Sequence, residues 1–144
     1  MFFAPGRKYA VLGASTNRGK FGNKILRWYI NHKLPVKPIN PSAEEVEGVK
    51  AYPTLNKYIE DLSISDESIG VSVVTPPQVS FEMFKEVLEK RNADKIASIW
   101  FQPGSFDSKV VKYVIEKLGV SKDSVISNND CILVSGEGKL RDEI

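Results

Sequence analysis

Glycine, hydroxyl and basic side chains gather in residues 13–22, directly after a short apolar run. This stretch contains three glycines, two hydroxyl side chains and the cations Arg18 and Lys20. Glycine lets backbone N–H groups approach an anion closely, and the start of a following helix attracts negative charge. The stretch therefore favours a phosphate-binding loop. The alternative is that Gly13 and Gly22 serve only turn and packing geometry.

The spacing of this loop does not match a known dinucleotide or nucleoside triphosphate motif. It fits neither G-x-G-x-x-G nor G-x-x-x-x-G-K-[ST]. A nicotinamide-binding domain also places Asp or Glu at the end of its second strand, where the carboxylate binds the ribose hydroxyls. Here that position holds Asn40, followed by Pro41. A ligand with a phosphorylated ribose, such as coenzyme A, is therefore favoured over NAD.

Few residues suggest catalysis or metal binding. The single histidine, His32, follows a predicted helix, and we expect it to be a solvated residue at the helix end. The single cysteine, Cys131, precedes Ile132 and Leu133. It is either a small core residue or a thiol near the reactive end of a ligand. We expect no catalytic residue and no metal site.

Short apolar runs alternate with segments of helical periodicity along the chain. We predict strands at residues 8–13, 34–39, 69–74 and 96–101, and helices at 21–32, 54–62, 80–91 and 110–118. This alternation predicts an α/β fold, a Rossmann-like open parallel sheet of about five strands with helices on both faces.

The sequence is less informative between and after these elements. Residues 41–53 read as a connection rich in small, acidic and turn residues. Either residues 125–126 or residues 131–134 supply a further strand, and periodicity does not separate the two. The polar tail, residues 136–144, is expected to be loose.

Composition limits the possible partners. A length of 144 residues predicts one domain over residues 1–144. The net charge is only +2, and basic residues are not interleaved with aromatic ones, so a nucleic-acid partner is not expected. The apolar runs are far shorter than a membrane span. One cysteine and no export signal predict a cytoplasmic protein.

Several short motifs occur in the order seen in CoA-binding domain proteins. They are Val11-Leu12-Gly13-Ala14-Ser15, Pro38-Ile39-Asn40-Pro41 followed by Gly48 and Tyr52-Pro53, Val73-Val74-Thr75-Pro76, Trp100-Phe101-Gln102-Pro103-Gly104, and Asn129-Asp130-Cys131. The resemblance covers residues from about Lys8 to about Val134. Such proteins are similar to the amino-terminal domain of the succinyl-CoA synthetase alpha subunit.

This resemblance implies a set of ligand-binding residues. The phosphates would be held by Gly13, Ser15, Arg18, Lys20 and Gly22, with Phe21 lining the same loop. The adenosine would lie beside Asn40 and Pro41, and the walls would be Val74, Thr75, Pro76, Gln102 and Gly104. Two residues depart from the usual pattern: Arg18 stands where many relatives carry proline, and Asp130 stands where arginine often precedes the cysteine.

The resemblance implies a function of binding rather than catalysis. We expect a stand-alone module that binds CoA or an acyl-CoA, with no independent catalytic activity. Two alternatives stay open: a partner-dependent subunit of an acyl-CoA or phosphoryl-transfer enzyme, and a nucleotide-sensing regulator. The expected partner is a small nucleotide ligand, with no nucleic acid and no membrane. A protein partner or a homodimer is compatible with the sequence.

Overall fold

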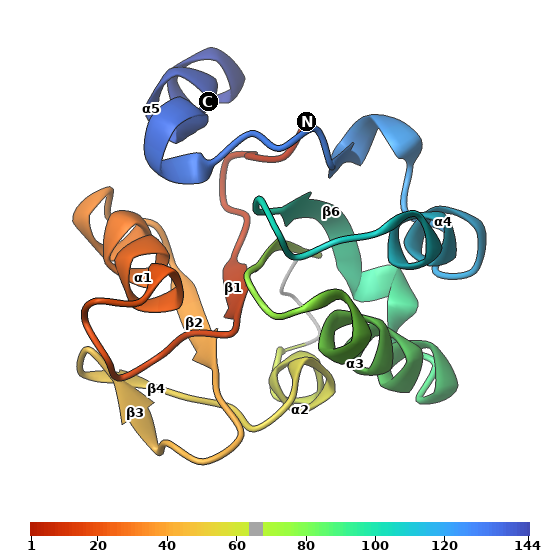
Figure 1. The fold of residues 1–144 in the computed structure, drawn as a ribbon, viewed down its shortest axis with the longest axis horizontal. Helices are drawn as coiled ribbons and strands as arrows, with labels where there is room; N and C mark the ends of the chain where they lie inside the picture. Colours follow the sequence, from red (N-terminus) through yellow and green to blue (C-terminus); the bar gives the residue numbers. More distant parts are fainter. Residues whose placement is uncertain (64–67) are drawn as a thin grey trace.

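The predicted alternation of strands and helices produces a parallel sheet. A computed structural model of the chain describes residues 1–63 and 68–144 (Figure 1). The five strands pair in parallel. In sheet order they are β2 (Val36–Ile39), β1 (Tyr9–Leu12), β5 (Ile69–Val73), β6 (Ile96–Phe101) and β7 (Val125–Ile126). The Rossmann-like α/β prediction is therefore confirmed, and residues 125–126 supply the fifth strand.

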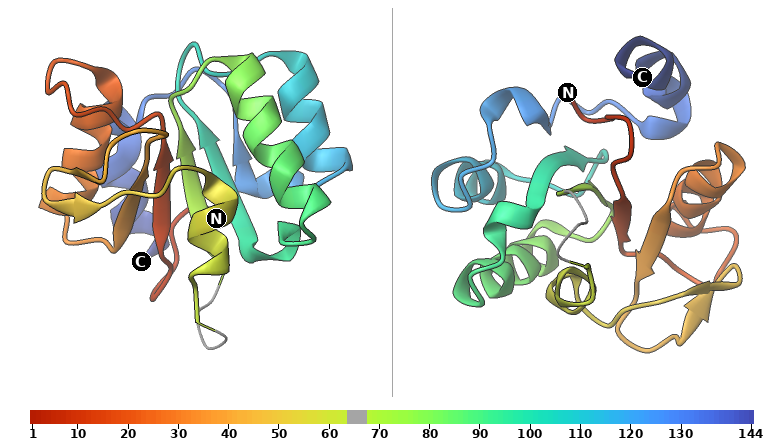
Figure 2. Two further views of the ribbon diagram at one scale, coloured as in Figure 1. Left: turned by 90° about the horizontal axis from the view of Figure 1, so that it is seen from below. Right: turned by 180° about the vertical axis from the view of Figure 1, so that it is seen from behind.

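Helices cover both faces of this sheet (Figure 2). They are α1 (Phe21–Asn31), α2 (Leu55–Glu60), α3 (Pro77–Glu89), α4 (Ser108–Glu116) and α5 (Ile132–Glu143), with 3-10 turns at Ala93–Lys95 and Lys122–Ser124. Buried residues of α2, α3 and α4 form one core cluster with the sheet, and those of α1 and α5 form the other. Among the described residues no helix is long and apolar enough to cross a bilayer.

The sequence places most helix starts well. Thr54 caps α2 by accepting a hydrogen bond from the Lys57 N–H at 3.1 Å, as predicted. Helix α3 begins three residues earlier than expected, at Pro77, because proline fits the first helical position, where its missing N–H costs nothing.

The chain end was predicted wrongly. Residues 131–134 form no strand, and the segment expected to be loose is helical to Glu143. A Cβ at Gly136 would lie 2.7 Å from Trp28, so the glycine lets α5 pack closely on α1. Glu143 accepts a hydrogen bond from the Phe3 N–H at 2.8 Å and pairs with Lys139 at 3.1 Å. These tertiary contacts order a tail whose sequence is polar.

The connection after β2 contains a small hairpin that the sequence did not reveal. Strands β3 (Glu45–Val46) and β4 (Val49–Lys50) pair antiparallel. The two turn residues between them have positive φ, 51° at Glu47 and 76° at Gly48. Such a turn matches the twist of a hairpin. The hairpin carries Glu47 toward the loop after β1.

Candidate functional site

The strand order places the predicted ligand loops at one edge of the sheet. The chain leaves β1 toward β2 on one side, while β5 pairs with β1 on the other. The loops after β1 and β5 therefore diverge at a switch point, where open α/β sheets bind ligands. The two loops are in contact, because a Cβ at Gly13 would lie 3.0 Å from the Thr75 nitrogen.

Two glycines allow the loop after β1 to fold tightly against α1. Gly13 has φ of 90°, which glycine adopts without strain. A Cβ at Gly22 would lie 1.9 Å from the Gly13 carbonyl oxygen, a distance no side chain tolerates. Gly22 therefore sets how closely the first turn of α1 approaches the end of β1. The packing alternative for these glycines thus has structural support, and it is compatible with phosphate binding on the outer side of the loop.

Side chains of the loop hold its backbone in place. The Ser15 hydroxyl accepts a hydrogen bond from the Asn17 N–H at 3.0 Å, and the Asn17 side chain accepts one from the Gly19 N–H at 2.9 Å. These two N–H groups are therefore engaged within the loop. The first N–H groups of α1, including those of Phe21 and Gly22, have no partner within the helix, as at every helix start. They are the backbone donors best placed for an anion.

The two cations of the loop lie at the surface. The side chain of Arg18 is 66% exposed and its Nε lies 3.4 Å from a Glu47 carboxylate oxygen. Lys20 is also exposed, at the residue that precedes α1. An exposed ion pair of this kind contributes little to stability, so Arg18 can turn to a stronger anion at small cost.

Three residues that the sequence analysis did not single out hold this loop in place: Asn23, Arg27 and Glu47. Asn23 is fully buried, and its amide donates to the Ser15 carbonyl at 2.8 Å and to Glu47 at 3.1 Å. Arg27 donates to the Arg18 carbonyl at 2.9 Å. The sequence offers one sign of the role of Asn23, because it is a polar amide within a predicted helix whose apolar residues form the core. Nothing in the sequence indicated the contact from Glu47.

Asn40 connects the loop after β2 to the loop after β1. Its side-chain N–H donates to the Ala14 carbonyl at 2.9 Å, and its oxygen accepts from the Ser42 and Ala43 N–H groups, each at 2.9 Å. Both ends of the amide are therefore engaged. Pro41 follows at the surface.

Tyr52 fixes the far side of this loop. The Asn40 N–H donates to the Tyr52 carbonyl at 2.9 Å, and the Tyr52 hydroxyl donates to Asp61. Burial, followed by the bond to Asp61, raises the pKa of Tyr52 to about 12. The hydroxyl therefore stays protonated and can donate at neutral pH.

Two hollows adjoin at the carboxyl edge of the strands. One, of about 400 Å³, is formed by the glycine loop and the loop after β5. The other, of about 290 Å³, lies between that loop, the loop after β6 and the start of α5. We call them the loop hollow and the apolar cavity. They share Phe21, Val74 and Pro76 as lining residues.

Most of the predicted site residues meet at these two hollows. The loop hollow includes Gly13, Lys20, Phe21, Gly22, Val74, Thr75 and Pro76, and the apolar cavity includes Phe21, Val74, Pro76, Gln102 and Gly104. Ser15, Arg18, Asn40 and Pro41 lie outside both linings. Residues not predicted to line them are Gly19, Ile25, Pro103 and Cys131.

Phe21 differs from its helical expectation. Phe21 shares an apolar spacing of three and four residues with Ile25 and Trp28, which predicts one common helix face, yet the Phe21 side chain is 62% exposed. It is the first residue of the helix, where the ring extends over the hollows instead of into the core. A large exposed aromatic side chain at the border of two hollows suits contact with a ligand.

One end of the buried Gln102 side-chain amide lacks a hydrogen-bond partner. The residue is 3% exposed, and its Oε1 accepts from the Ile132 N–H at 2.9 Å. Its Nε2 is buried and has no hydrogen-bond partner in the described part of the chain. Buried donors are nearly always paired, so a ligand acceptor is the natural partner for this nitrogen.

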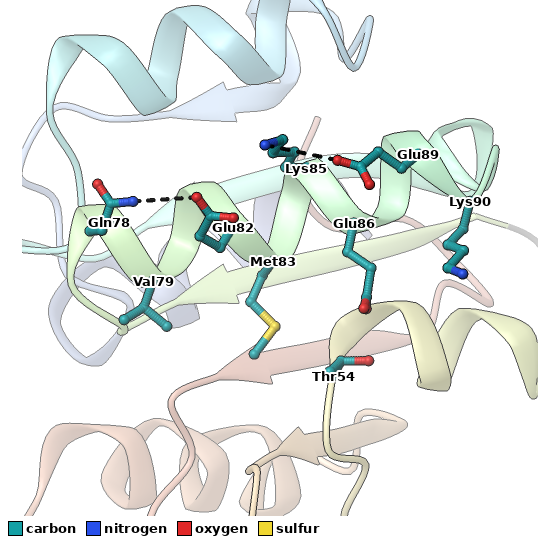
Figure 3. A pocket seen from close by; sticks show the side chains of 9 residues that line it. All are labelled: Thr54, Gln78, Val79, Glu82, Met83, Lys85, Glu86, Glu89 and Lys90. Atoms are coloured by element: carbon teal, nitrogen blue, oxygen red, sulfur yellow. Dashed lines mark hydrogen bonds and ion pairs between the residues drawn. The ribbon is translucent and has the colours of Figure 1, made fainter.

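A larger hollow lies elsewhere, along the side of α3 beside Thr54 (Figure 3). It measures about 530 Å³ and is lined mainly by one face of α3, with Val79 and Met83 as its apolar part. Its charged residues include Glu82, Glu86 and Glu89 against two lysines. That surplus of acid is unfavourable for phosphates.

Solved structures of other proteins share the fold of this chain. A conserved hypothetical protein from Pyrococcus furiosus is 32% identical, with 90% of this chain and 98% of that chain covered and a TM-score of 0.70. A hypothetical protein from Pyrococcus horikoshii OT3 is 25% identical, with 93% and 84% covered and a TM-score of 0.72.

The same fold also occurs inside a larger enzyme. The dinucleotide-forming acetyl-coenzyme A synthetase 1 of Ca. Korarchaeum cryptofilum is 22% identical, with 88% of this chain and 26% of that chain covered and a TM-score of 0.65. Finally, residues 7–137 match the family described as "CoA binding domain". This chain therefore belongs to the CoA binding domain family.

Proposed function

We propose that this chain binds CoA or an acyl-CoA across the loop hollow and the apolar cavity. It does so as one binding domain over residues 1–144, without completing a reaction of its own. One observation carries the proposal: two hollows adjoin through Phe21, Val74 and Pro76, and only one of them is lined by the glycine loop and Lys20. CoA has a matching division, with charged phosphates at one end and a thiol-bearing arm of low polarity at the other.

The loop hollow suits the phosphates. The start of α1 supplies unpaired N–H groups and the positive end of the helix dipole. Arg18 and Lys20 add two positive charges beside it. The Gly22 contact with Gly13 lets the backbone, rather than side chains, face this anion. In this arrangement the adenosine would lie toward Asn40 and Pro41.

The apolar cavity suits the pantetheine arm. At about 290 Å³ it lies at the lower end of the range for small-molecule sites, so it would hold part of the ligand and not all of it. Val74, Pro76 and Gly104 form its walls, and Gln102 offers a buried amide donor that has no partner among the described residues. An amide or thioester carbonyl in this arm would satisfy that donor.

The imidazole of the chain lines neither hollow of the proposed site. His32 is the only histidine. Its ring stacks on Trp28 at 4.1 Å, and its Nδ1 lies 2.8 Å from the Trp28 carbonyl oxygen. It therefore caps the end of α1, opposite the helix end that forms the site.

Calorimetry of the purified protein with CoA, NAD and ATP tests the proposal. We expect saturable binding of CoA that is tighter than binding of either other nucleotide. No saturable heat with CoA, or tighter binding of NAD, would overturn it. Turnover of an acyl-CoA by the isolated chain would instead support the enzyme alternative.

A further inference from the structure

The apolar cavity contains a thiol that the proposed binding function does not use. Cys131 is the only cysteine of the chain, and it lies half-buried in the cavity lining directly before α5. A lone cysteine is not evidence of a site. Two features at the carboxyl end of strand β6 bear on this position: one fixes the cysteine backbone, and the other, a buried unpaired donor, points to a ligand.

The first feature is that β6 holds the backbone on both sides of Cys131. The Trp100 indole N–H donates to the Asp130 carbonyl at 2.8 Å, and Gln102 accepts from the Ile132 N–H at 2.9 Å. Trp100 is fully buried and Gln102 is 3% exposed. These two contacts fix the cysteine backbone against the carboxyl end of β6 and keep its residue in the cavity lining.

The second feature is the unpaired nitrogen of Gln102. The Ile132 N–H is a donor, so the side-chain atom that meets it must be the amide oxygen, which leaves the NH₂ group on the other end. That NH₂ group is buried without a partner in the described residues. A buried donor favours an acceptor, and Gln102 and Cys131 line the same cavity, so a ligand that supplies this acceptor would lie beside the thiol.

The thiol end of CoA has matching chemistry. Its last amide carbonyl is separated from the sulfur by the amide nitrogen and two methylene groups, so an acceptor and a sulfur lie a few ångströms apart. The cavity presents an amide donor and a thiol on neighbouring parts of the chain. Its remaining lining, which includes Phe21, Ile25 and Pro103, is apolar and suits the methylene groups.

We propose that Cys131 is a thiol–disulfide exchange site for the disulfide form of CoA, an inference that rests on the proposed CoA-binding function. The Cys131 thiol loses its proton to solvent, and the thiolate attacks one sulfur of CoA disulfide. A bond forms between Sγ and that sulfur as the CoA–CoA disulfide bond breaks. One CoA leaves as a thiolate and takes up a proton. CoA disulfide is the oxidant, and free CoA reverses the step.

Intact-mass spectrometry of the full chain tests this step. We expect the reduced protein to gain the mass of one disulfide-linked CoA on incubation with CoA disulfide, and to lose it on treatment with dithiothreitol. Because there is one cysteine, any such adduct is assigned to Cys131, and Cys131→Ser should form none. Adduct formation on Cys131→Ser would overturn the assignment.

Glutathione disulfide is the matched control, since it has a reactive disulfide but no adenosine phosphates. We expect the rate of adduct formation with CoA disulfide to exceed that with glutathione disulfide by about tenfold or more, because binding positions the sulfur. Arg18→Ala combined with Lys20→Ala should slow the reaction with CoA disulfide and leave the glutathione rate unchanged. Equal rates with both disulfides would mean that Cys131 is merely an exposed thiol.

The test separates this inference from the function on which it rests. If CoA binds in calorimetry but CoA disulfide reacts no faster than glutathione disulfide, only the role of Cys131 fails. If CoA does not bind, the proposed function fails as well.

Discussion

The loop hollow and the apolar cavity are built differently from the hollow along α3. The site hollows at the carboxyl edge combine loops that follow β1, β5 and β6 with the start of α5. The hollow along α3 is larger, about 530 Å³, but comes from one helix face and Thr54 (Figure 3). Polar side chains there pair along their own helix, as Lys85 does with Glu89 at 4.0 Å.

This difference teaches that volume alone does not identify the site. In the loop hollow and the apolar cavity, backbone approach, positive charge and an unpaired donor come from separate segments and converge. Along α3, neighbouring side chains on a single helix satisfy one another, and no buried group lacks a partner among the residues described there. Five variants test this difference between the hollows.

The largest effect is expected from Gly22→Ala. The new Cβ would lie 1.9 Å from the Gly13 carbonyl oxygen, so the start of α1 must move away from β1. Overpacking of this kind costs about 3 kcal/mol in free energy of unfolding, and the displaced helix start should abolish CoA binding. Thermal unfolding and calorimetry measure the two losses.

Gly19→Ala is the control for that variant. Its Cβ would meet only the Asn17 side chain, at 3.3 Å. It should keep both stability and binding within a small margin. Equal losses in the two variants would show that any added methyl group in the loop is harmful, whatever it contacts.

The close fit at Gly22 also shows what the sequence could reveal. Short-range patterns predicted the glycine loop and the strands of the sheet, because they determine strands, turns and helix faces. Most of the residues around the two hollows were implied by the resemblance to CoA-binding domain proteins. The sequence did not reveal that Gly22 touches Gly13, since that distance depends on how α1 packs on β1. Composition gives no measure of such packing.

The errors share a physical cause. Helix α5 was missed because its order depends on contacts with Trp28 and Phe3, which are remote in sequence. Cys131 was not assigned to the cavity because only the hydrogen bonds from β6 show where it lies. Local propensity predicts only the tendency of a segment to form a helix or strand, and contacts with residues remote in sequence determine which structure it adopts.

The next largest effect is expected from Arg18→Ala combined with Lys20→Ala. A hydrogen bond to a charged group contributes about 1.5–3 kcal/mol, so we expect CoA affinity to fall about 10- to 100-fold. Both side chains are exposed, and Arg18 is paired only with Glu47, so the unfolding temperature should change little. Unchanged affinity would place the phosphates elsewhere.

A smaller effect is expected from Asn40→Asp. The substitution removes the donor to the Ala14 carbonyl and sets a carboxylate oxygen against it, at a cost of about 1–3 kcal/mol in stability. The oxygen that accepts from Ser42 and Ala43 is retained. Chemical denaturation measures the loss, and an unchanged midpoint would contradict it.

The same variant locates the ribose end of the ligand. If the adenosine lies beside Asn40, the new carboxylate repels the 3′-phosphate of CoA. Affinity for CoA should then fall more than affinity for dephospho-CoA, which lacks that phosphate. A fall that is equal for both ligands would indicate only that the loop has shifted.

The smallest effect is expected from Lys85→Ala combined with Lys90→Ala in the hollow along α3. This variant removes two positive charges, as the Arg18 and Lys20 double variant does, so the change in net charge is the same. Both lysines line the larger hollow and neither lies at the glycine loop. Lys85 forms an exposed ion pair with Glu89, whose loss costs little stability.

If CoA is attracted by charge in general, the two double variants should weaken binding alike. If the loop after β1 holds the phosphates, calorimetry should find the affinity of this variant within about twofold of the original protein, since distant surface charges are screened at physiological salt. A loss comparable to that of the loop variant would move the site to α3.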